Sequence, residues 1–182
     1  MTLRDPWQRL STGARRRTFF LAAAAAIGLT IALGRIGAPL KTPAAPDGII
    51  SFELAGSHGR AGAILASWDV ATRDAAQLSL VVDYVYLIAY PLAISLGCAM
   101  VAGRLHPRRP DLATVALALS WAVLVAGVLD AIENAALLRQ LAAGPGTITS
   151  RLAQVAALAK FALVAASLPC ALLAFLPDRT KA

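Results

Sequence analysis

The chain is poor in charged residues, in aromatic residues and in cysteine. Of its 182 residues, 15% are charged and 6% are aromatic, whereas 58% are hydrophobic and the mean hydropathy is +0.67. A soluble domain is roughly 45–50% apolar and about 25% charged. The composition therefore excludes an ordinary soluble domain and a disordered chain, and it is typical of helices that lie in lipid.

The few cysteines and histidines limit redox and metal chemistry. Cys98 and Cys170 both fall in apolar segments, and the chain has no C-x-x-C motif. A dithiol mechanism is therefore not expected, and both cysteines are expected to be small buried hydrophobic residues. His58 and His106 fall in separate loops, so a bis-histidine haem within the membrane is not expected either. No cofactor follows from the sequence.

Four segments are long and apolar enough to cross a bilayer, which takes about 20 residues. They cover residues 18–34, 78–103, 112–138 and 152–176. We therefore expect an all-α fold, a four-helix transmembrane bundle. The first segment is the shortest, and Arg16 and Arg17 before it leave open a twin-arginine export signal.

The positive charge collects at the ends of these apolar segments. The net charge is +7 and the isoelectric point is about 10.3. Lys and Arg are concentrated in residues 1–17, in the 104–110 loop and in the tail 177–182, and such residues stay on the cytoplasmic side. We expect a multi-pass protein of the inner (plasma) membrane with both termini cytoplasmic. The partner implied is membrane lipid, and nucleic-acid binding is not expected.

The segment 35–77 would then lie outside the cytoplasm, and part of it has helical periodicity. From Arg60 onward, apolar residues recur at helical spacing as Ile64, Leu65 and Trp68. This pattern predicts an extracytoplasmic amphipathic helix on the membrane surface, with Trp68 at the interface. The preceding stretch, residues 49–55, is apolar apart from Glu53 and is expected to reach the mouth of the bundle.

Ionisable residues inside the expected spans are the most informative feature of the sequence. A charge at the centre of a bilayer costs roughly 2.5–3.5 kcal/mol on translocon scales, yet the last three spans carry Asp83, Asp130, Glu133 and Lys160. At a rise of about 1.5 Å per residue, all of them fall in the outer third of the membrane. One shared polar pocket is the simplest arrangement that keeps them out of lipid.

Helical spacing places further polar residues beside these ionisable groups. Tyr86 and Tyr90 follow Asp83 on one helix face, and Asn134 follows Asp130 and Glu133 on another. The acids exceed the lysine by two formal charges, so bound protons, a metal ion, an organic cation or a nearby arginine must compensate them. A metal held by Asp83, Asp130, Glu133 and His58 stays open. Alternatively, Lys160 pairs with Asp130 only to fix helix packing.

The motifs in the last two-thirds of the chain resemble those of small four-helix bacterial membrane proteins. They comprise Phe52-Glu53-Leu54-Ala55, Trp68, Asp83 with Tyr90, Leu129-Asp130-Ala131-Ile132-Glu133-Asn134, and Lys160. The resemblance covers about residues 51–176 and implies a four-helix membrane fold without a particular activity.

A looser architectural resemblance is to the four-helix sterol-isomerase and sigma-2-receptor group. Pockets of that group place carboxylates among aromatic residues and hold cationic amines or sterol-like ligands. The chain departs from the group because no histidine and only one tryptophan, Trp121, fall within its expected spans. This departure puts isomerase chemistry in doubt.

These observations predict a buried carboxylate and lysine pocket that binds a lipid or a small amphiphilic ligand. The sequence leaves open whether the ligand is also modified by acid–base chemistry. The proton-handling candidates are Asp130 and Glu133, with Asp83 as a further acid and Lys160 tuning their pKa values. The ligand-binding candidates are Glu53, Trp68, Tyr86, Tyr90 and Asn134.

Two alternatives come from other function classes. In one, the chain is an accessory subunit of a larger membrane complex, bound to another membrane protein, and its polar cluster only stabilises it. In the other, the chain provides a proton or cation pathway. The pathway is disfavoured because the inner half of the spans offers only Ser95, Ser120 and Ser167 as polar candidates.

Overall fold

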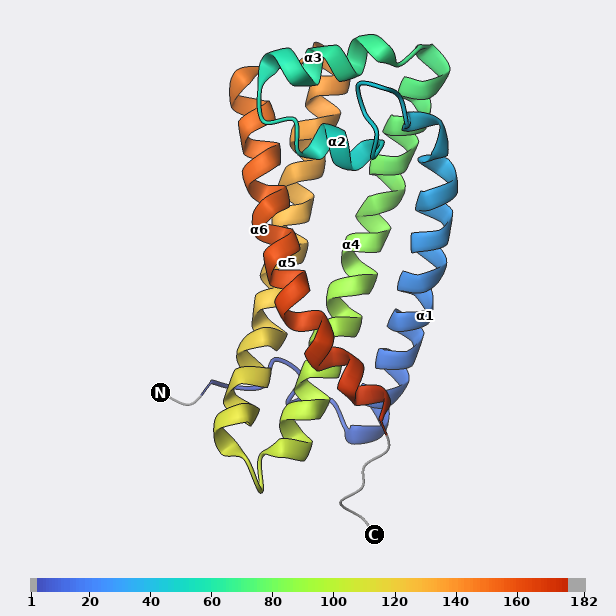
Figure 1. Cartoon of the computed structure of the whole chain (residues 1–182). Helices are drawn as coiled ribbons and strands as arrows, with labels where there is room; N and C mark the ends of the chain where they lie inside the picture. Colours follow the sequence, from blue (N-terminus) through green and yellow to red (C-terminus); the bar gives the residue numbers. More distant parts are fainter. Residues whose placement is uncertain (1–2, 177–182) are drawn as a thin grey trace. The chain divides into compact units, whose positions relative to one another are not determined.

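The computed structural model describes residues 3–176, and the secondary structure in this range is helical apart from one isolated bridge between Thr42 and Ala45. Figure 1 shows the elements along the chain. The long helices are α1 (Thr12–Ile36), α4 (Val70–Leu105), α5 (Pro110–Ala143) and α6 (Thr147–Leu172). The short ones are η1 (Ala38–Leu40), α2 (Ile49–Glu53), α3 (His58–Ser67) and η2 (Leu173–Phe175). The all-α prediction is confirmed.

The four long helices are long and apolar enough to cross a membrane. The first three contain the predicted spans 18–34, 78–103 and 112–138 and extend beyond them, whereas α6 with η2 begins before residue 152 and ends at Phe175, one residue short of the predicted end. Helix α1 begins at Thr12 rather than residue 18, and α4 begins at Val70 rather than residue 78. Hydropathy marks only the apolar part of a helix, whereas backbone hydrogen bonding continues through polar turns. The predicted tail, residues 177–182, lies outside the described residues.

The chain divides into two compact units, and each long helix contributes a segment to both. Unit 1 comprises residues 1–26, 88–127 and 160–182, and its described parts are residues 3–26, 88–127 and 160–176. Unit 2 comprises residues 27–87 and 128–159. Helices α2 and α3 therefore belong entirely to unit 2. Pro91 in α4 and Pro169 in α6 both lie inside continuous helix within unit 1.

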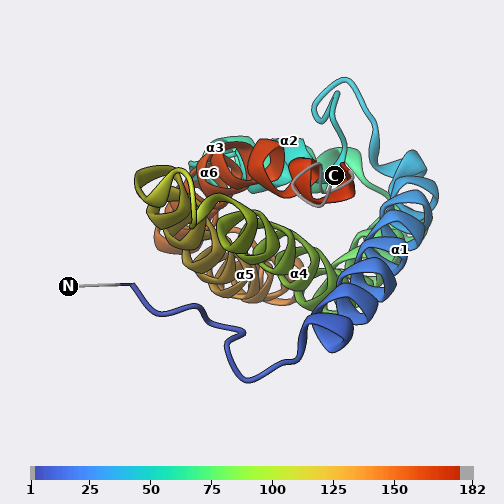
Figure 2. The same ribbon diagram turned by 90° about the horizontal axis from the view of Figure 1, so that it is seen from below.

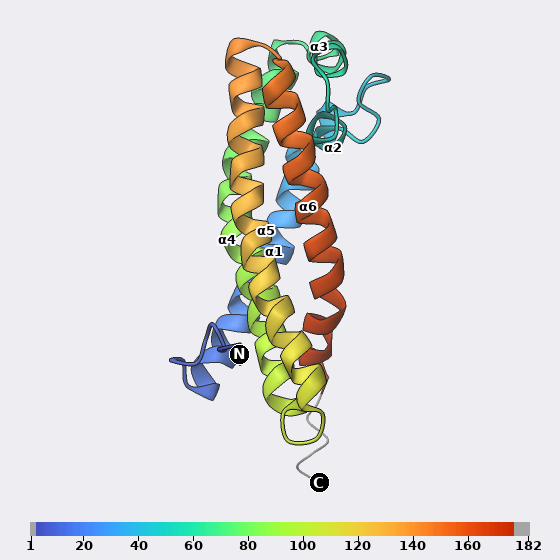
Figure 3. The same ribbon diagram turned by 90° about the vertical axis from the view of Figure 1, so that its left-hand side faces the viewer.

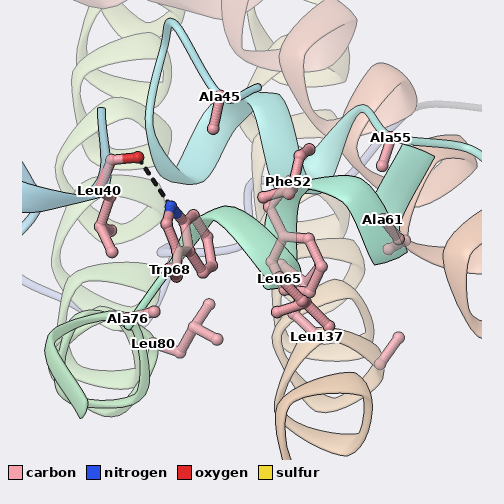
Figure 4. Close-up of a cluster of buried hydrophobic side chains, with 13 residues drawn as sticks. Leu40, Ala45, Phe52, Ala55, Ala61, Leu65, Trp68, Ala76, Leu80 and Leu137 are labelled. Carbon is pink, nitrogen blue, oxygen red and sulfur yellow. Dashed lines mark hydrogen bonds between the residues drawn. The ribbon is translucent and has the colours of Figure 1, made fainter. Parts of the chain in front are cut away.

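Within unit 2, the short helices α2 and α3 lie across the segments of the long helices, as Figures 1 and 3 both show. They enclose a hydrophobic cluster that includes Leu40, Phe52, Ile64, Trp68 and Leu137. Figure 4 shows Trp68 in this cluster beside Leu40, and the indole Nε1 donates a 2.9 Å hydrogen bond to the Leu40 carbonyl. The Phe52 and Trp68 rings meet edge to face at 5.4 Å.

The expected position of Trp68 at a membrane interface is therefore wrong. Its side chain is only 2% exposed. The indole has an apolar body and one polar N–H, and a buried tryptophan needs an acceptor for that group. The Leu40 carbonyl supplies the acceptor, so Trp68 anchors the loop after α1 to the interior of unit 2 rather than to a surface.

The amphipathic pattern that begins at Arg60 does not form one continuous helix. Helix α3 ends at Ser67, and α4 begins at Val70. The Asp69 carboxylate accepts a 2.8 Å hydrogen bond from the Thr72 amide, which caps the start of α4 and competes with a continuous helix. Arg73 donates hydrogen bonds to the carbonyls of Leu65 and Trp68 and so stabilises the corner.

In unit 1, the chain before α1 packs along α4 and α5, as Figure 2 shows from below. The Trp7 indole donates a 2.8 Å hydrogen bond to Ser95 of α4, and the Trp121 indole of α5 donates one of 2.9 Å to the Arg4 carbonyl. Ser95 also bonds to Ser120 at 2.8 Å. The serines expected to be pathway candidates therefore make hydrogen bonds between segments of this unit.

Candidate ligand-binding site

Helix α5 buries a polar stripe and exposes an apolar one. Asp130 is 2%, Glu133 0% and Asn134 1% exposed, whereas Val128 is 61% and Ile132 41% exposed. The buried positions follow the i, i+3, i+4 spacing of one helix face. The predicted grouping of these three polar residues on a buried face is thus present in unit 2.

A cavity of about 360 Å³ lies in unit 2 beside this stripe. Its walls come from the end of α1, the loop before α2, α2 itself, α4 and α5. The polar lining residues are Lys41, Asp47, Glu53, Ser79, Asp83 and Asn134. The remaining lining residues are Leu33, Gly34, Gly37, Ile49, Ile50 and Leu80.

Exposure changes across the cavity. Lys41, Asp47 and Ile50 are exposed, so they mark the side that is open to the surroundings. Glu53 is 8% and Asn134 1% exposed, so they mark the closed side. A bound molecule would therefore pass exposed charged side chains before reaching a buried carboxylate and a buried amide.

The best-defined polar contact in the cavity joins α4 to α5. Asn134 Nδ2 donates a 2.7 Å hydrogen bond to Asp83 Oδ2. A hydrogen bond to a carboxylate is stronger than one between neutral groups. The lining holds three carboxyl groups, those of Asp47, Glu53 and Asp83, but only one cationic group, that of Lys41. The formal charges of these four lining side chains therefore sum to −2.

Two glycines set the position of α2 and Glu53. Gly48, immediately before α2, has φ +63°, and Gly56, shortly after α2, has φ +67°. This left-handed region is costly for residues with a Cβ atom. The Gln154 side chain of α6 lies against Gly56 and donates a 3.2 Å hydrogen bond to the Leu54 carbonyl. These turns hold the C-terminal end of α2, and hence Glu53, at the cavity.

Among the predicted site residues, Glu53, Asp83 and Asn134 line the cavity together. Asp130 and Glu133 are buried in the same unit but are not lining residues. Trp68 belongs to the hydrophobic cluster instead. Tyr86 accepts a 3.4 Å hydrogen bond from Thr30 Oγ1 and likewise does not line the cavity.

Lys160 and Tyr90 belong to unit 1. Lys160 is 7% exposed, and its Nζ lies 4.9 Å from the centre of the Phe161 ring, while Tyr90 is 6% exposed. The chamber shared by Lys160 and the acids of the other spans stays a prediction, because those acids belong to unit 2.

Three polar lining residues, Ser79, Lys41 and Asp47, were not predicted from the sequence. Ser79 precedes Asp83 by one helical turn, so the i, i+4 spacing on α4 could have identified it. Lys41 and Asp47 lie in the irregular segment between η1 and α2, where no periodicity indicates which side chains face inward. Their proximity to the cavity depends on the turn at Gly48, which the sequence does not define.

The geometry of the described residues does not support a metal site of Asp83, Asp130, Glu133 and His58. Within residues 3–176, no three His, Cys, Asp or Glu side chains gather in a way that could hold a metal ion. His58 Nδ1 lies 2.9 Å from the Pro145 carbonyl, in the loop between α5 and α6.

Comparison with known proteins finds no match. This holds for protein-family models, for curated proteins and for solved structures. Conclusions about function therefore rest on the cavity and on its chemistry.

Proposed function

We propose that the chain is a multi-pass integral protein of the inner (plasma) membrane with both termini in the cytoplasm. The four long apolar helices support this assignment. Large apolar side chains along them are exposed, as with Ile27, Ile31, Val85 and Val128, while polar groups such as Glu133 are buried. Lipid would cover the first set, and the positive residues at the helix ends favour the proposed orientation.

We further propose that the unit 2 cavity binds a small amphiphilic molecule with a cationic group. The observation that carries this proposal is the gathering of three carboxyl groups, those of Glu53, Asp83 and Asp47, in the lining of one cavity. A cationic group in this cavity would be attracted to the neighbouring carboxyl groups, and more strongly there than in bulk water.

The apolar part of such a ligand would lie against Leu33, Ile49 and Leu80. Small-molecule sites typically occupy about 300–1,000 Å³ and combine apolar walls with a few polar groups. The volume of about 360 Å³ lies at the lower end of that range. It suits an alkylamine or a lipid headgroup with part of its chain better than a complete two-chain lipid.

Binding is favoured over catalysis by the positions of the acids. Asp130 and Glu133, the residues predicted to transfer protons, are not among the lining residues. A general acid or base must come within hydrogen-bonding distance of the group it protonates or deprotonates. We therefore assign the cavity a role in binding, with Asp83 and Glu53 as the residues that recognise the cationic group.

The binding proposal is tested with octylammonium, octanoate and octanol added to the protein in mild detergent. These probes share one chain and differ in charge, so titration calorimetry should detect binding of octylammonium only. Asp83→Asn should weaken that binding at least tenfold, which corresponds to about 1.4 kcal/mol. Asp111→Asn is the matched control, because Asp111 is an exposed acid of unit 1. Equal binding of octylammonium and octanol would contradict the proposal.

The alternative occupant of the exposed apolar faces is another membrane protein. Purification in mild detergent distinguishes it from lipid. A stable free protein that keeps its helicity supports the proposed function. Loss of the fold whenever the chain is separated from a co-purifying protein would instead support an accessory subunit. Resistance to alkaline carbonate extraction tests the membrane assignment itself.

A further inference from the structure

A second cavity, in unit 1, is an open hollow along the start of α1 whose five lining residues are all exposed. Its volume is about 440 Å³, and Gly13, Arg16, Arg17, Phe20 and Leu21 line it. These residues follow the i, i+3, i+4, i+7, i+8 spacing, so they form one continuous face of the helix. The face carries a glycine in the first turn, two arginines in the second turn and two apolar side chains in the third.

The three consecutive arginines in α1 have different partners. Arg15 forms an ion pair with Asp5 and donates a hydrogen bond to the Leu10 carbonyl. Arg16 lies over the Phe20 ring at 5.8 Å. Within residues 3–176, neither Arg16 nor Arg17 has a carboxylate partner. The cavity thus receives two guanidinium groups that have no carboxylate partner within residues 3–176.

The N-terminal end of α1 adds a partial positive charge to that of the two arginines. Helix α1 has 25 residues and no acidic residue in its first turn. The aligned peptide dipoles place a partial positive charge at the N-terminus of a helix, which favours an anion there. Gly13 lies in this turn and presents no side chain toward the cavity. Two arginines and the helix terminus therefore act on the same volume.

The apolar part of the cavity indicates what kind of anion fits. Phe20 is 44% and Leu21 67% exposed, and they lie roughly 4.5 Å and 6 Å beyond Arg17 along the helix axis at the usual helical rise. A free phosphate would use only the basic part. A phospholipid carries its phosphate next to acyl chains, in the same order as the basic and apolar residues along α1.

We propose that this face of α1 is a binding site for an anionic phospholipid, with the phosphate at Arg16 and Arg17 and an acyl chain along Phe20 and Leu21. The site is separate from the unit 2 cavity and does not depend on its ligand. It depends only on the proposed membrane location for its supply of lipid.

Native mass spectrometry of the detergent-solubilised protein tests the site with phosphatidylglycerol and phosphatidylcholine that carry identical acyl chains. We expect preferential binding of phosphatidylglycerol. The double variant R16Q/R17Q should bind it about thirtyfold more weakly, since one basic residue near a lipid headgroup contributes about a factor of five. The matched control R108Q/R109Q removes the same charge from exposed residues of unit 1 outside this cavity and should leave the affinity unchanged.

Two further variants keep the test decisive. If R16Q/R17Q does not fold, R17Q alone should weaken phosphatidylglycerol binding about fivefold. Leu21→Ala should weaken phosphatidylglycerol binding, because it removes part of the apolar surface that an acyl chain would contact. It should leave the helicity of the protein unchanged, because alanine is a good helix former.

Three results would overturn the proposal. Equal affinity for the two lipids would show that the phosphate charge is not recognised. Equal losses in R16Q/R17Q and R108Q/R109Q would show a general effect of charge. Competition by glycerol 3-phosphate as strong as that by phosphatidylglycerol would indicate a site for a free phosphate. Release of the protein by alkaline carbonate with lipid preference intact would instead contradict only the membrane assignment.

Discussion

The amide of Asn134 donates a 2.7 Å hydrogen bond to the carboxylate of Asp83, and this bond joins α5 to α4 at the wall of the unit 2 cavity. Asn134 is 1% exposed, so its donor has little access to competing water. The bond orients the carboxylate and spreads part of its charge onto the amide. One residue pair therefore contributes both to the packing of unit 2 and to the electrostatics of the candidate site.

A double-mutant cycle on this pair should reveal a coupling of about 1–2 kcal/mol in the free energy of unfolding. Hydrogen bonds to charged groups contribute about 1.5–3 kcal/mol, and bonds between membrane helices contribute less on average. The variants N134A, D83A and N134A/D83A would be unfolded reversibly in detergent mixtures and followed by circular dichroism. Strict additivity of the two single changes would show that the bond does not stabilise unit 2.

The turn at Gly56 should tolerate no side chain. Gly56 has φ +67°, and a Cβ atom there would meet the Gln154 side-chain amide closer than real Cβ atoms approach. We expect G56A to lower the stability of unit 2 by about 1–2 kcal/mol, from the combined backbone strain and steric conflict. Thermal unfolding measures the loss, and limited proteolysis should show earlier cleavage near α2.

Gly59 is the matched control for that change. It lies in α3, has an ordinary backbone conformation, and a Cβ atom there would meet nothing within 4 Å. G59A should therefore leave stability unchanged or raise it by up to about 1 kcal/mol. The double variant G56A/Q154A should be more stable than G56A, because the steric conflict with the Gln154 side chain is removed. It should remain less stable than the wild type, because the backbone strain at residue 56 persists. A full recovery would mean that φ at Gly56 is not costly.

The helices and their buried faces could be predicted from the sequence because they depend on local periodicity. The spacing of Asp130, Glu133 and Asn134 identified the buried side of α5, and hydropathy located four helices. The same reasoning failed at Trp68, since its position fits the amphipathic pattern but its indole bonds to Leu40, distant in sequence. The local signal for the break between α3 and α4 was Asp69, a residue type that caps helix starts. The continuous helical spacing of apolar residues hid this signal.

The composition of the cavity could be predicted only in part. Glu53, Asp83 and Asn134 were identified because a charged or polar residue in an apolar segment needs an explanation. Lys41 and Asp47 were not, because polar residues in an irregular segment are ordinary. Their place at the cavity depends on a turn at Gly48 and on the burial of Leu40, both of which require the tertiary structure.

The cap at Asp69 should make the start of α4 sensitive to acid. Hydrogen bonds from the Thr72 side chain and amide lower the pKa of the exposed Asp69 carboxyl below its ordinary value of 3.8. A carboxyl group whose pKa is lower in the folded state than in the unfolded state stabilises the folded state at pH values above its unfolded-state pKa. This stabilisation is lost as the pH falls through the folded-state pKa. The difference in melting temperature between the wild type and D69A should be constant above about pH 5 and shrink below about pH 4.

Asp69→Asn separates the charge from the cap, since asparagine caps helices about as well as aspartate. D69N should keep most of the amide-exchange protection of the first turn of α4 and should lack the acid dependence that Asp69 contributes. A D69A variant whose difference from the wild type does not change with pH would contradict the assigned origin of the lowered pKa.

In unit 1, α4 and α6 approach so closely at Gly97 that the helix contact should fail with any larger residue. A Cβ atom at Gly97 would lie 2.9 Å from the Ala171 Cβ and 3.1 Å from the Ala171 carbonyl oxygen. Small residues permit such approaches between membrane helices, and the nearby bond from Cys98 Sγ to the Ser167 carbonyl, at 3.4 Å, depends on it. We expect G97A to cost about 1–3 kcal/mol of unfolding free energy, the usual range for overpacking.

The companion change A171G should separate steric conflict from helix propensity. In G97A/A171G the conflict with the Ala171 methyl group is removed, so the double variant should unfold at a higher temperature than G97A does. Gly103, also in α4, has open space where a Cβ atom would lie, so G103A should be neutral or stabilising by up to about 1 kcal/mol. If G97A and G103A unfold alike, the two helices cannot lie as close as these distances require, and the packing of unit 1 would need a different explanation.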